Sequence, residues 1–356
     1  MSEEISNELP EDIEQPKEKS KSNKKIAIGL DVGTMNIVCS RSDSNKVNMT
    51  RNVFLKIDPE EIHLSELSNI SYVRNEDDNE LFIIGQDAFT FANIFAQEVS
   101  RPMESGLISS KEIDAIEVLT LMIKSLIGDL KDKDAYCSYS IPATAIDSER
   151  SVTYHEKVFG RILSSIGVNH SPINEAMAIV YSECAKEQFS GICVSFGAGM
   201  ANTVIAYKGI EALKFSTARS GDWVDRQVAD SLNMIPNRVT SIKEKNFDLE
   251  ESFLTEKNKK KRRILEALTY YYNSLIEYTI KKIIKEFDEK VDIEIDEKIP
   301  FIISGGTSLP KGFLQCFKEG IKRYNLPFEI SEIRRAKNPL TSVSNGLLVK
   351  TLSDIK

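Results

Sequence analysis

One strand–turn–strand pattern occurs twice in this chain, and the duplication limits the folds that it can adopt. The first copy is KKIAIGLDVGTMNIVCSR, residues 24–41, in which two apolar runs flank a turn at Gly33. The second copy is GICVSFGAGMANTVIAYKG, residues 191–209, with its turn at Gly197 and Gly199. Segments with helical spacing follow both copies. The duplication therefore predicts two similar lobes that face one another across a cleft, where a nucleotide would sit.

The segments between the copies and after the second one alternate between helix and strand patterns. Two helical patterns, residues 113–130 and 148–167, flank the strand pattern AYCSYSIP. A long amphipathic helix is expected from about residue 264 to residue 287, before the strand IPFIIS at 299–304. Strands that alternate with helices predict an α/β fold with mixed sheets flanked by helices.

Composition limits the partners of the protein. The chain has 356 residues, is 41% hydrophobic and carries a net charge of -8 at pH 7. This charge argues against general nucleic-acid binding, which requires a positive face. Residues 1–24 are rich in charged and polar side chains, so we expect a disordered tail that does not insert directly into a membrane. No apolar run reaches the ~18 residues of a membrane span. We expect a cytoplasmic protein.

The turn of the first copy has the composition of a phosphate-binding loop. Gly33 and its neighbours Thr34, Met35 and Asn36 can direct backbone N–H groups at phosphate oxygens. Asp31, at the end of the strand, can hold a hydrated Mg²⁺ ion. An ordinary hairpin with an aspartate near its turn explains the same residues, so the motif alone does not decide between them.

A third glycine motif follows the strand IPFIIS. In ISGGTSLPKGF, Gly305 and Gly306 allow a flat ligand to lie against bare backbone. Thr307 and Ser308 are expected to cap the helix that follows. A plain strand-to-helix turn is the alternative.

Three further features are weaker on their own. Gly197 and Gly199 offer a second backbone cradle, but no acidic residue accompanies them. Lys243 and Glu244 can bracket a sugar or a base, or can belong to a solvated helix face. Glu175 opens an apolar helix, where a carboxylate also suits the helix dipole.

The order of these features resembles the actin-like superfamily of ATPases, which includes sugar kinases and the heat-shock chaperone ATPase domain. Hairpin, glutamate-led helix, hairpin, Ile-Lys-Glu-Lys and Gly-Gly-Thr follow one another along residues 25–350. Within the superfamily, GLDVGTMN, RPMESGLI (101–108) and SGDWVDRQVA (220–229) resemble segments of the prokaryotic actins MreB and MamK. The resemblance implies duplicated actin-like, ribonuclease H-like lobes with a nucleotide in the cleft between them.

The resemblance also implies roles for individual residues, with ATP or ADP and Mg²⁺ as ligands. Phosphate contacts from the first lobe are implied for Gly33, Thr34, Met35 and Asn36, and from the second lobe for Gly197, Ala198, Gly199 and Met200. Contacts to ribose and adenine are implied for Lys243, Glu244, Gly305, Gly306 and Thr307. Asp31 would hold the water shell of Mg²⁺, and Glu175 would position the attacking water.

One position departs from the family pattern. Family members usually carry aspartate where this chain has Ser195, and that aspartate helps to order the Mg²⁺ shell and the water. Ser195 keeps a hydrogen-bonding oxygen but lacks the charge. We therefore expect a protein that binds ATP well and hydrolyses it slowly.

The resemblance divides the chain into lobes. Lobe I is expected at 25–176, with a small subdomain at about 50–95, and lobe II at 177–335, with a small subdomain at about 223–263. Residues 336–356 are expected to return to lobe I.

The function that this organisation favours is a prokaryotic actin-like filament whose main partner is itself. The alternatives are a non-polymerising ATP-binding switch or scaffold, and a small-molecule kinase in which Asp222 or Asp225 is the base. The basic run KNKKKRR, residues 257–263, is either a solvated helix start or a contact for a neighbouring subunit or another anionic partner.

Overall fold

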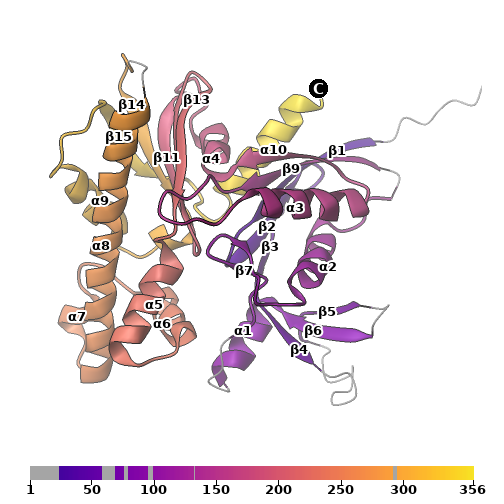
Figure 1. Cartoon of the computed structure of the whole chain (residues 1–356), viewed down its shortest axis with the longest axis horizontal. Coiled ribbons are helices and arrows are strands. Elements are labelled where there is room, and N and C mark those ends of the chain that lie inside the picture. The colour runs from indigo at the N-terminus through magenta and orange to yellow at the C-terminus, as the bar shows by residue number, and fades with distance from the viewer. Residues whose placement is uncertain (1–23, 58–68, 76–78, 95–98, 132, 292–294) are drawn as a thin grey trace, which may run out of the picture.

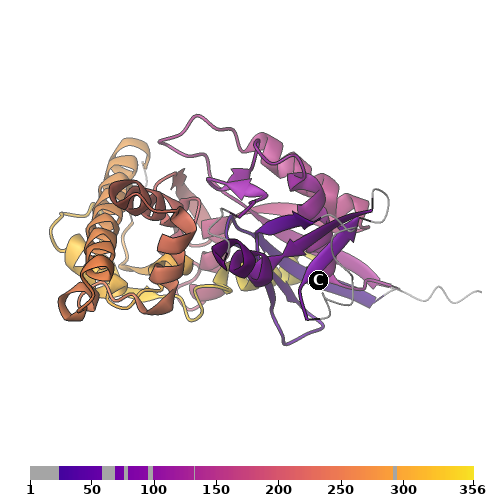
Figure 2. The same ribbon diagram turned by 90° about the horizontal axis from the view of Figure 1, so that it is seen from below.

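The computed structural model describes residues 24–57, 69–75, 79–94, 99–131, 133–291 and 295–356. The expected disordered tail, apart from Lys24, lies outside these residues. The described chain forms two lobes that lie side by side (Figure 1), and a view from below shows the same separation (Figure 2). None of the described helices is long and apolar enough to cross a membrane.

Each lobe is built on a five-stranded mixed sheet, and the two sheets have the same topology. The strand order is β10-β9-β1-β2-β3 in lobe I and, read from the equivalent edge, β15-β14-β11-β12-β13 in lobe II. The first three strands of each lobe pair antiparallel, and the other two run parallel to the first strand. The duplication predicted from the two hairpins is confirmed. The strands of lobe I are β1 (Lys24–Val32), β2 (Asn36–Arg41), β3 (Asn48–Arg51), β9 (Lys133–Ile141) and β10 (Asn169–Asn174). Those of lobe II are β11 (Gly191–Phe196), β12 (Ala201–Tyr207), β13 (Ile210–Thr217), β14 (Ile299–Ser304) and β15 (Ile330–Arg335).

Insertions between the third and fourth strands of each sheet include the elements at the lower end of the molecule in Figure 1. In lobe I they are β4 (Phe54–Ile57), β5 (Tyr72–Asn75), β6 (Glu80–Ile84), α1 (Gly85–Ile94), β7 (Met103–Glu104), β8 (Leu107–Ile108) and α2 (Ala115–Ile127). In lobe II they are the helices α5 (Gly221–Leu232), α6 (Pro236–Asn246), α7 (Ser252–Thr255) and α8 (Lys259–Lys290). Helices α3 (Thr153–Ser165) and α9 (Phe313–Ile321) connect the parallel strands.

Two helices cross between the lobes. Helix α10 (Ser342–Asp354), the last of the chain, packs on β1 and β9 of lobe I, while α4 (Glu175–Glu183) packs on β11 and β12 of lobe II. They meet at Gly346, where a Cβ atom would lie 1.7 Å from the carbonyl oxygen of Ala178. Only glycine permits this approach. The crossing joins the lobes through a shared apolar core.

Two sequence-based details are wrong. Helix α8 begins at Lys259, not near residue 264, because the side chain of Asn258 accepts hydrogen bonds from the backbone N–H groups of Lys260 and Lys261. The basic run therefore forms the first turns of the helix.

The residues after Gly305 form a short 3₁₀ turn (Gly306–Ser308), and the residue before α9 is Gly312, so Thr307 and Ser308 cap no α-helix.

Candidate nucleotide-binding site

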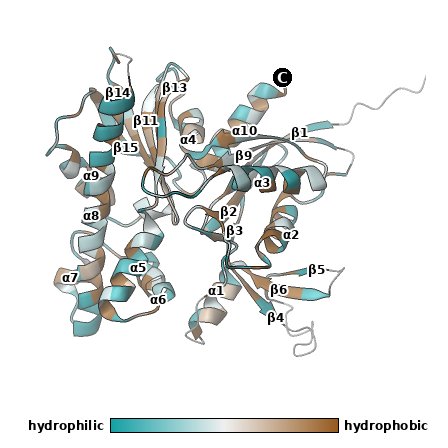
Figure 3. Ribbon diagram, in the orientation of Figure 1, coloured by the Kyte–Doolittle hydropathy of each residue, from teal (hydrophilic) through white to brown (hydrophobic). Residues whose placement is uncertain are grey.

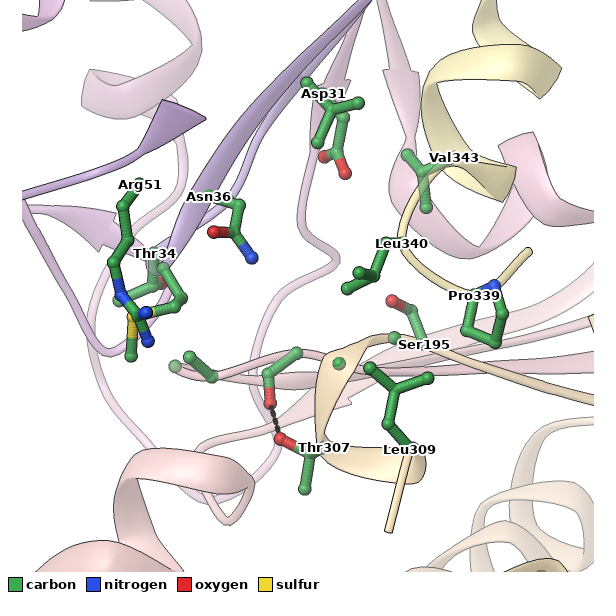
Figure 4. Close-up of a pocket in the computed structure, with 18 of the residues that line it drawn as sticks. Asp31, Thr34, Asn36, Arg51, Ser195, Thr307, Leu309, Pro339, Leu340 and Val343 are labelled. Carbon is green, nitrogen blue, oxygen red and sulfur yellow. Dashed lines mark hydrogen bonds between the residues drawn. The ribbon is translucent and has the colours of Figure 1, made fainter. Parts of the chain in front are cut away.

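A cavity of about 780 Å³ lies between the lobes, within the size range of small-molecule sites. The residues to which the resemblance assigns a role in the site all line this one cavity, although they come from five separate segments. They are Asp31, Gly33, Thr34, Met35, Asn36, Glu175, Ser195, Gly197, Ala198, Gly199, Met200, Lys243, Glu244, Gly305, Gly306 and Thr307. Figure 4 shows how several of them surround the space.

The two glycine turns have the same hydrogen bond. The N–H of Gly33 donates to the carbonyl oxygen of Asn36 at 2.9 Å, and the N–H of Gly197 donates to that of Met200 at 3.0 Å. In lobe I the Asn52 amide holds the turn, because its Nδ2 donates to the Gly33 carbonyl at 2.9 Å. Both lobes thus present a rigid backbone loop to the cavity, as a phosphate site requires.

Asp31 and Ser195 occupy equivalent positions, each two residues before the turn glycine of its hairpin. The Ser195 hydroxyl donates to Oε1 of Glu175 at 2.6 Å, and Nδ2 of Asn202 donates to Oε2 at 2.8 Å. The Ser140 hydroxyl donates to Oδ1 of Asp31 at 2.8 Å. Each carboxylate is therefore held in position by neutral hydrogen-bond donors.

Burial shifts the titration of both acids. Burial, and then the nearby charge of Asp31, raises the pKa of Glu175 to about 8, although the bond from Ser195 opposes the shift. Burial likewise raises the pKa of Asp31 to about 6, opposed by the bond from Ser140. Two partly buried acids that have no ion-pair partner among the described residues are the kind of donor set that a hard cation such as Mg²⁺ prefers. The residues present fit Mg²⁺ at this end of the cavity.

The other end of the cavity is walled by bare backbone and apolar side chains. Gly305 has a φ of +86°, and a Cβ atom there would lie 2.3 Å from the carbonyl oxygen of Phe196. The Thr307 hydroxyl donates to the Gly197 carbonyl at 2.7 Å and so links the third motif to the second turn (Figure 4). Apolar and aromatic side chains also line the cavity, among them Phe247, Tyr272, Leu309, Pro339, Leu340 and Val343. A flat, apolar-faced group such as a base fits this end.

Lys243 and Glu244 lie on α6 at the cavity wall, and both are engaged by other residues. Nζ of Lys243 is 2.7 Å from Oδ2 of Asp225. Nη2 of Arg51, from β3 of lobe I, is 2.5 Å from Oε1 of Glu244. The guanidinium of Arg51 also stacks over the Phe89 ring, 4.0 Å from its centroid. An ion pair therefore spans the two lobes at the cavity.

A second ion pair joins the lobes nearby. Nη1 of Arg101, from the RPMESGLI segment, lies 2.9 Å from Oδ1 of Asp222 at the start of α5. The two segments that resembled prokaryotic actins outside the phosphate loops thus contact one another.

Sequence reasoning missed Ser140, Asn202, Asn52 and Arg51. The register of the second hairpin was a usable signal, because a turn at residues 197–200 pairs Ser195 with Asn202, as the structure does. No comparable signal existed for Ser140 or Arg51, which reach the site from strands that do not belong to any glycine motif.

Two mixed sheets of the same topology, with glycine turns from both at one interlobe cavity, define the actin-like fold. The solved structure titled "MamK double helical filament" is similar over 93% of this chain and 99% of its own, with a TM-score of 0.68 and 16% identity. MreB5 of Spiroplasma citri bound to ADP has a TM-score of 0.63 and 14% identity over 93% of this chain and 98% of its own. The ethanolamine utilization protein EutJ of Carboxydothermus hydrogenoformans has a TM-score of 0.52 and 17% identity, over 97% and 92% of the two chains. The chain belongs to the Volactin family, whose model matches residues 26–351. A search of curated proteins finds no match.

Proposed function

We propose that the protein is an actin-like cytoskeletal protein that binds ATP with Mg²⁺, polymerises into filaments and hydrolyses the nucleotide slowly to ADP and phosphate. The observation that carries the proposal is the meeting of two equivalent glycine turns, two partly buried acids and a set of apolar side chains in one cavity. A nucleoside triphosphate has the matching sequence of groups: a phosphate chain, a cation and a flat base.

The binding roles follow from the two ends of the cavity. The turns at 33–36 and 197–200 bind the β- and γ-phosphates from opposite lobes through backbone N–H groups. Gly305, Gly306 and Thr307 bind the adenosine, and Lys243 with Glu244 binds the ribose and base. Asp31 would hold Mg²⁺, and the ion when bound would neutralise phosphate charge.

Hydrolysis requires a water in line with the bond between the γ-phosphorus and the bridging oxygen. Ionised Glu175 orients that water and accepts one of its protons, while the oxygen of the water bonds to phosphorus and the bridging oxygen leaves with ADP, which gives free phosphate. Glu175 accepts a proton only when ionised, and its raised pKa leaves it largely protonated near neutral pH in the nucleotide-free protein. Its hydrogen bond from Ser195 supplies no charge to compensate. This arrangement supports slow turnover.

Self-assembly is supported by the similarity to a protein solved as a double helical filament. At 16% identity that similarity concerns the fold, so assembly by this chain is the part that experiment must decide.

A non-polymerising ATP-dependent switch is the second candidate, and the Ser195–Glu175 hydrogen bond favours it because the bond occupies a hydrolytic group. The kinase alternative receives less support. Asp222 is paired with Arg101, Asp225 is paired with Lys243, and neither residue lines the cavity.

Nucleotide-dependent sedimentation tests the proposal. We expect the full chain to pellet at high speed with Mg²⁺ and ATP, and to remain in the supernatant without nucleotide. Binding of a fluorescent ATP analogue without any pelleted protein would favour the switch, and phosphate transfer to a sugar would favour the kinase.

A further inference from the structure

The first turns of α8 carry an unusual concentration of positive charge. We define the basic tip as Lys257, Lys259, Lys260, Lys261, Arg262 and Arg263, all of which are exposed. The first turn of α8 contains no acidic residue. The N-terminus of a helix has a partial positive charge, so cations there are unfavourable. The basic side chains therefore lower the stability of α8 at its N-terminus.

Internal ion pairs offset only part of this cost. Within the described residues, Lys261 pairs with Glu256 and Arg262 pairs with Glu266, whereas no carboxylate lies within ion-pair distance of Lys259, Lys260 or Arg263. An external anion would relieve the repulsion among these side chains.

Exposed apolar side chains border the basic tip. Leu254 on α7 is 63% exposed, and Tyr270 on α8 is 69% exposed. Tyr270 lies on the same helix face as Arg263, since seven residues make nearly two turns. In Figure 3 the lower end of α8 is hydrophilic and α7 beside it is hydrophobic. The surface therefore fits a peptide that carries acidic residues with a few apolar side chains among them.

The chain itself contains such a peptide. Residues 1–16, MSEEISNELPEDIEQP, have six acidic residues and no basic one, and include Ile5, Leu9 and Ile13. Their net charge is -6, opposite in sign to that of the basic tip.

We propose that residues 1–16 of one copy bind the basic tip of a second copy. The start of β1 and the start of α8 lie at opposite corners of the molecule (Figure 1). Residues 17–23 span at most about 25 Å when extended, which is about half the length of α8 at 1.5 Å per residue. Because this linker is short and its attachment lies at the opposite corner from the tip, we assign the contact to a second copy and not to the tip of the same chain. A contact between different surfaces of two identical chains is head-to-tail and propagates along a chain of subunits. The contact itself does not depend on the proposed function. Only its consequence, a chain of subunits, rests on the proposed self-assembly.

The test is a binding titration in which the tail and the tip are on separate molecules. The receptor is the full-length protein with its tail made neutral (E3Q, E4Q, E8Q, E11Q, D12N and E14Q), and the probe is a fluorescent peptide of residues 1–16. We expect anisotropy to report saturable binding at low salt that weakens as salt is raised. Adding K259E, K260E and R263E to the receptor should weaken binding at least tenfold. A second peptide, with lysine at the six acidic positions, should bind the variant that carries K259E, K260E and R263E better than it binds the receptor without these substitutions.

Two controls make the result interpretable. The triple variant K124E, K186E and K322E carries the same charge change at exposed lysines on other elements and should bind the peptide nearly as well as the receptor does. The tip variant places acids at a helix N-terminus, so its melting temperature should not fall, which separates lost binding from lost folding. The inference would be overturned if the peptide of residues 1–16 bound the receptor and its tip variant with equal affinity, or if it bound neither.

The same preparations separate this inference from the proposed function. Peptide binding at the basic tip without nucleotide-dependent pelleting would support the contact and contradict the filament. Pelleting by the full chain without peptide binding would support the filament and contradict the contact. If the tip variant loses affinity for anionic lipid vesicles while the peptide binds neither receptor, the tip serves a membrane and the inference is wrong.

Discussion

The hydroxyl of Ser195 donates a 2.6 Å hydrogen bond to Oε1 of Glu175. Ser195 lies in the second hairpin, and Glu175 lies in the first turn of α4. The lobe boundaries expected from the sequence place Glu175 in lobe I and Ser195 in lobe II. Ser195 is only 2% exposed, so bulk water does not compete for this bond. The contact orients the carboxylate without adding charge, and it underlies our expectation of slow hydrolysis.

Replacement of Ser195 by aspartate should speed phosphate release. The S195D variant adds the carboxylate that actin-like relatives usually carry, beside Glu175 and near Asp31, where Mg²⁺ compensates its charge. We expect a gain of about tenfold or more at saturating Mg²⁺, which is less than the roughly 10²-fold or larger effect of a fully positioned acid or base. Phosphate release by purified wild type and variant checks this. The S195A variant is the control, and a rate for S195D equal to wild type would show that the missing acid does not limit turnover.

The raised pKa of Glu175 makes the stability of the nucleotide-free protein depend on pH. The folded-state pKa of about 8 exceeds the ordinary glutamate value near 4.3, so ionisation opposes folding and stability falls as pH rises from about 5 to 8. The E175Q variant cannot ionise, and its amide is accommodated because the Ser195 hydroxyl can accept as well as donate. We expect E175Q to exceed wild type by a few kcal/mol at pH 8.5 and by little at pH 5. Urea unfolding at both pH values measures the difference, and a gap that does not change with pH would contradict the assignment.

The ion pair between Arg51 and Glu244 should retard nucleotide exchange. It spans the lobes at the cavity, and Glu244 is half of the proposed ribose and base contact. Because the Glu244 side chain is 43% exposed, the pair contributes no more than about 1 kcal/mol. The R51Q variant should therefore release a fluorescent ADP analogue about threefold to fivefold faster in stopped flow, while R51K stays closer to wild type. Unchanged release in R51Q would mean that the pair does not restrain the cleft.

Glycine at position 305 should be essential to the fold of the cavity wall. A side chain there meets both an unfavourable φ and the Phe196 carbonyl oxygen 2.3 Å away. We expect G305A to lose roughly 2–4 kcal/mol of unfolding free energy. Gly167 provides the matched control, because its φ is +76° but no atom lies within 4 Å of an added Cβ, so G167A should lose only about 1 kcal/mol. Similar losses in the two variants would show that contact with Phe196 is unimportant.

The duplicated hairpins made much of the fold predictable from the sequence. Each turn glycine follows a strand, and strand pairing across a short turn is a local property that residues near Gly33 and Gly197 determine. The helix start at Lys259 was missed for a local reason too, since the Asn258 cap stands inside a run of charges that lacks apolar periodicity.

The site was predictable where it lies on glycine turns and less so where distant strands supply it. Ser140 reaches Asp31 only because β9 pairs with β1, and Arg51 reaches Glu244 only because the lobes close. Both contacts depend on tertiary structure that no local pattern records. The raised pKa of Glu175 has the same origin, because burial between α4 and β11 causes it.

The most direct test of the central claim is phosphate release from ATP with Mg²⁺, measured across a range of protein concentrations with sedimentation of the same samples. We predict a rate near zero up to a threshold concentration and a steep rise above it, with pelleted protein appearing at the same threshold. A rate strictly proportional to concentration, with all protein in the supernatant, would contradict a nucleotide-driven filament.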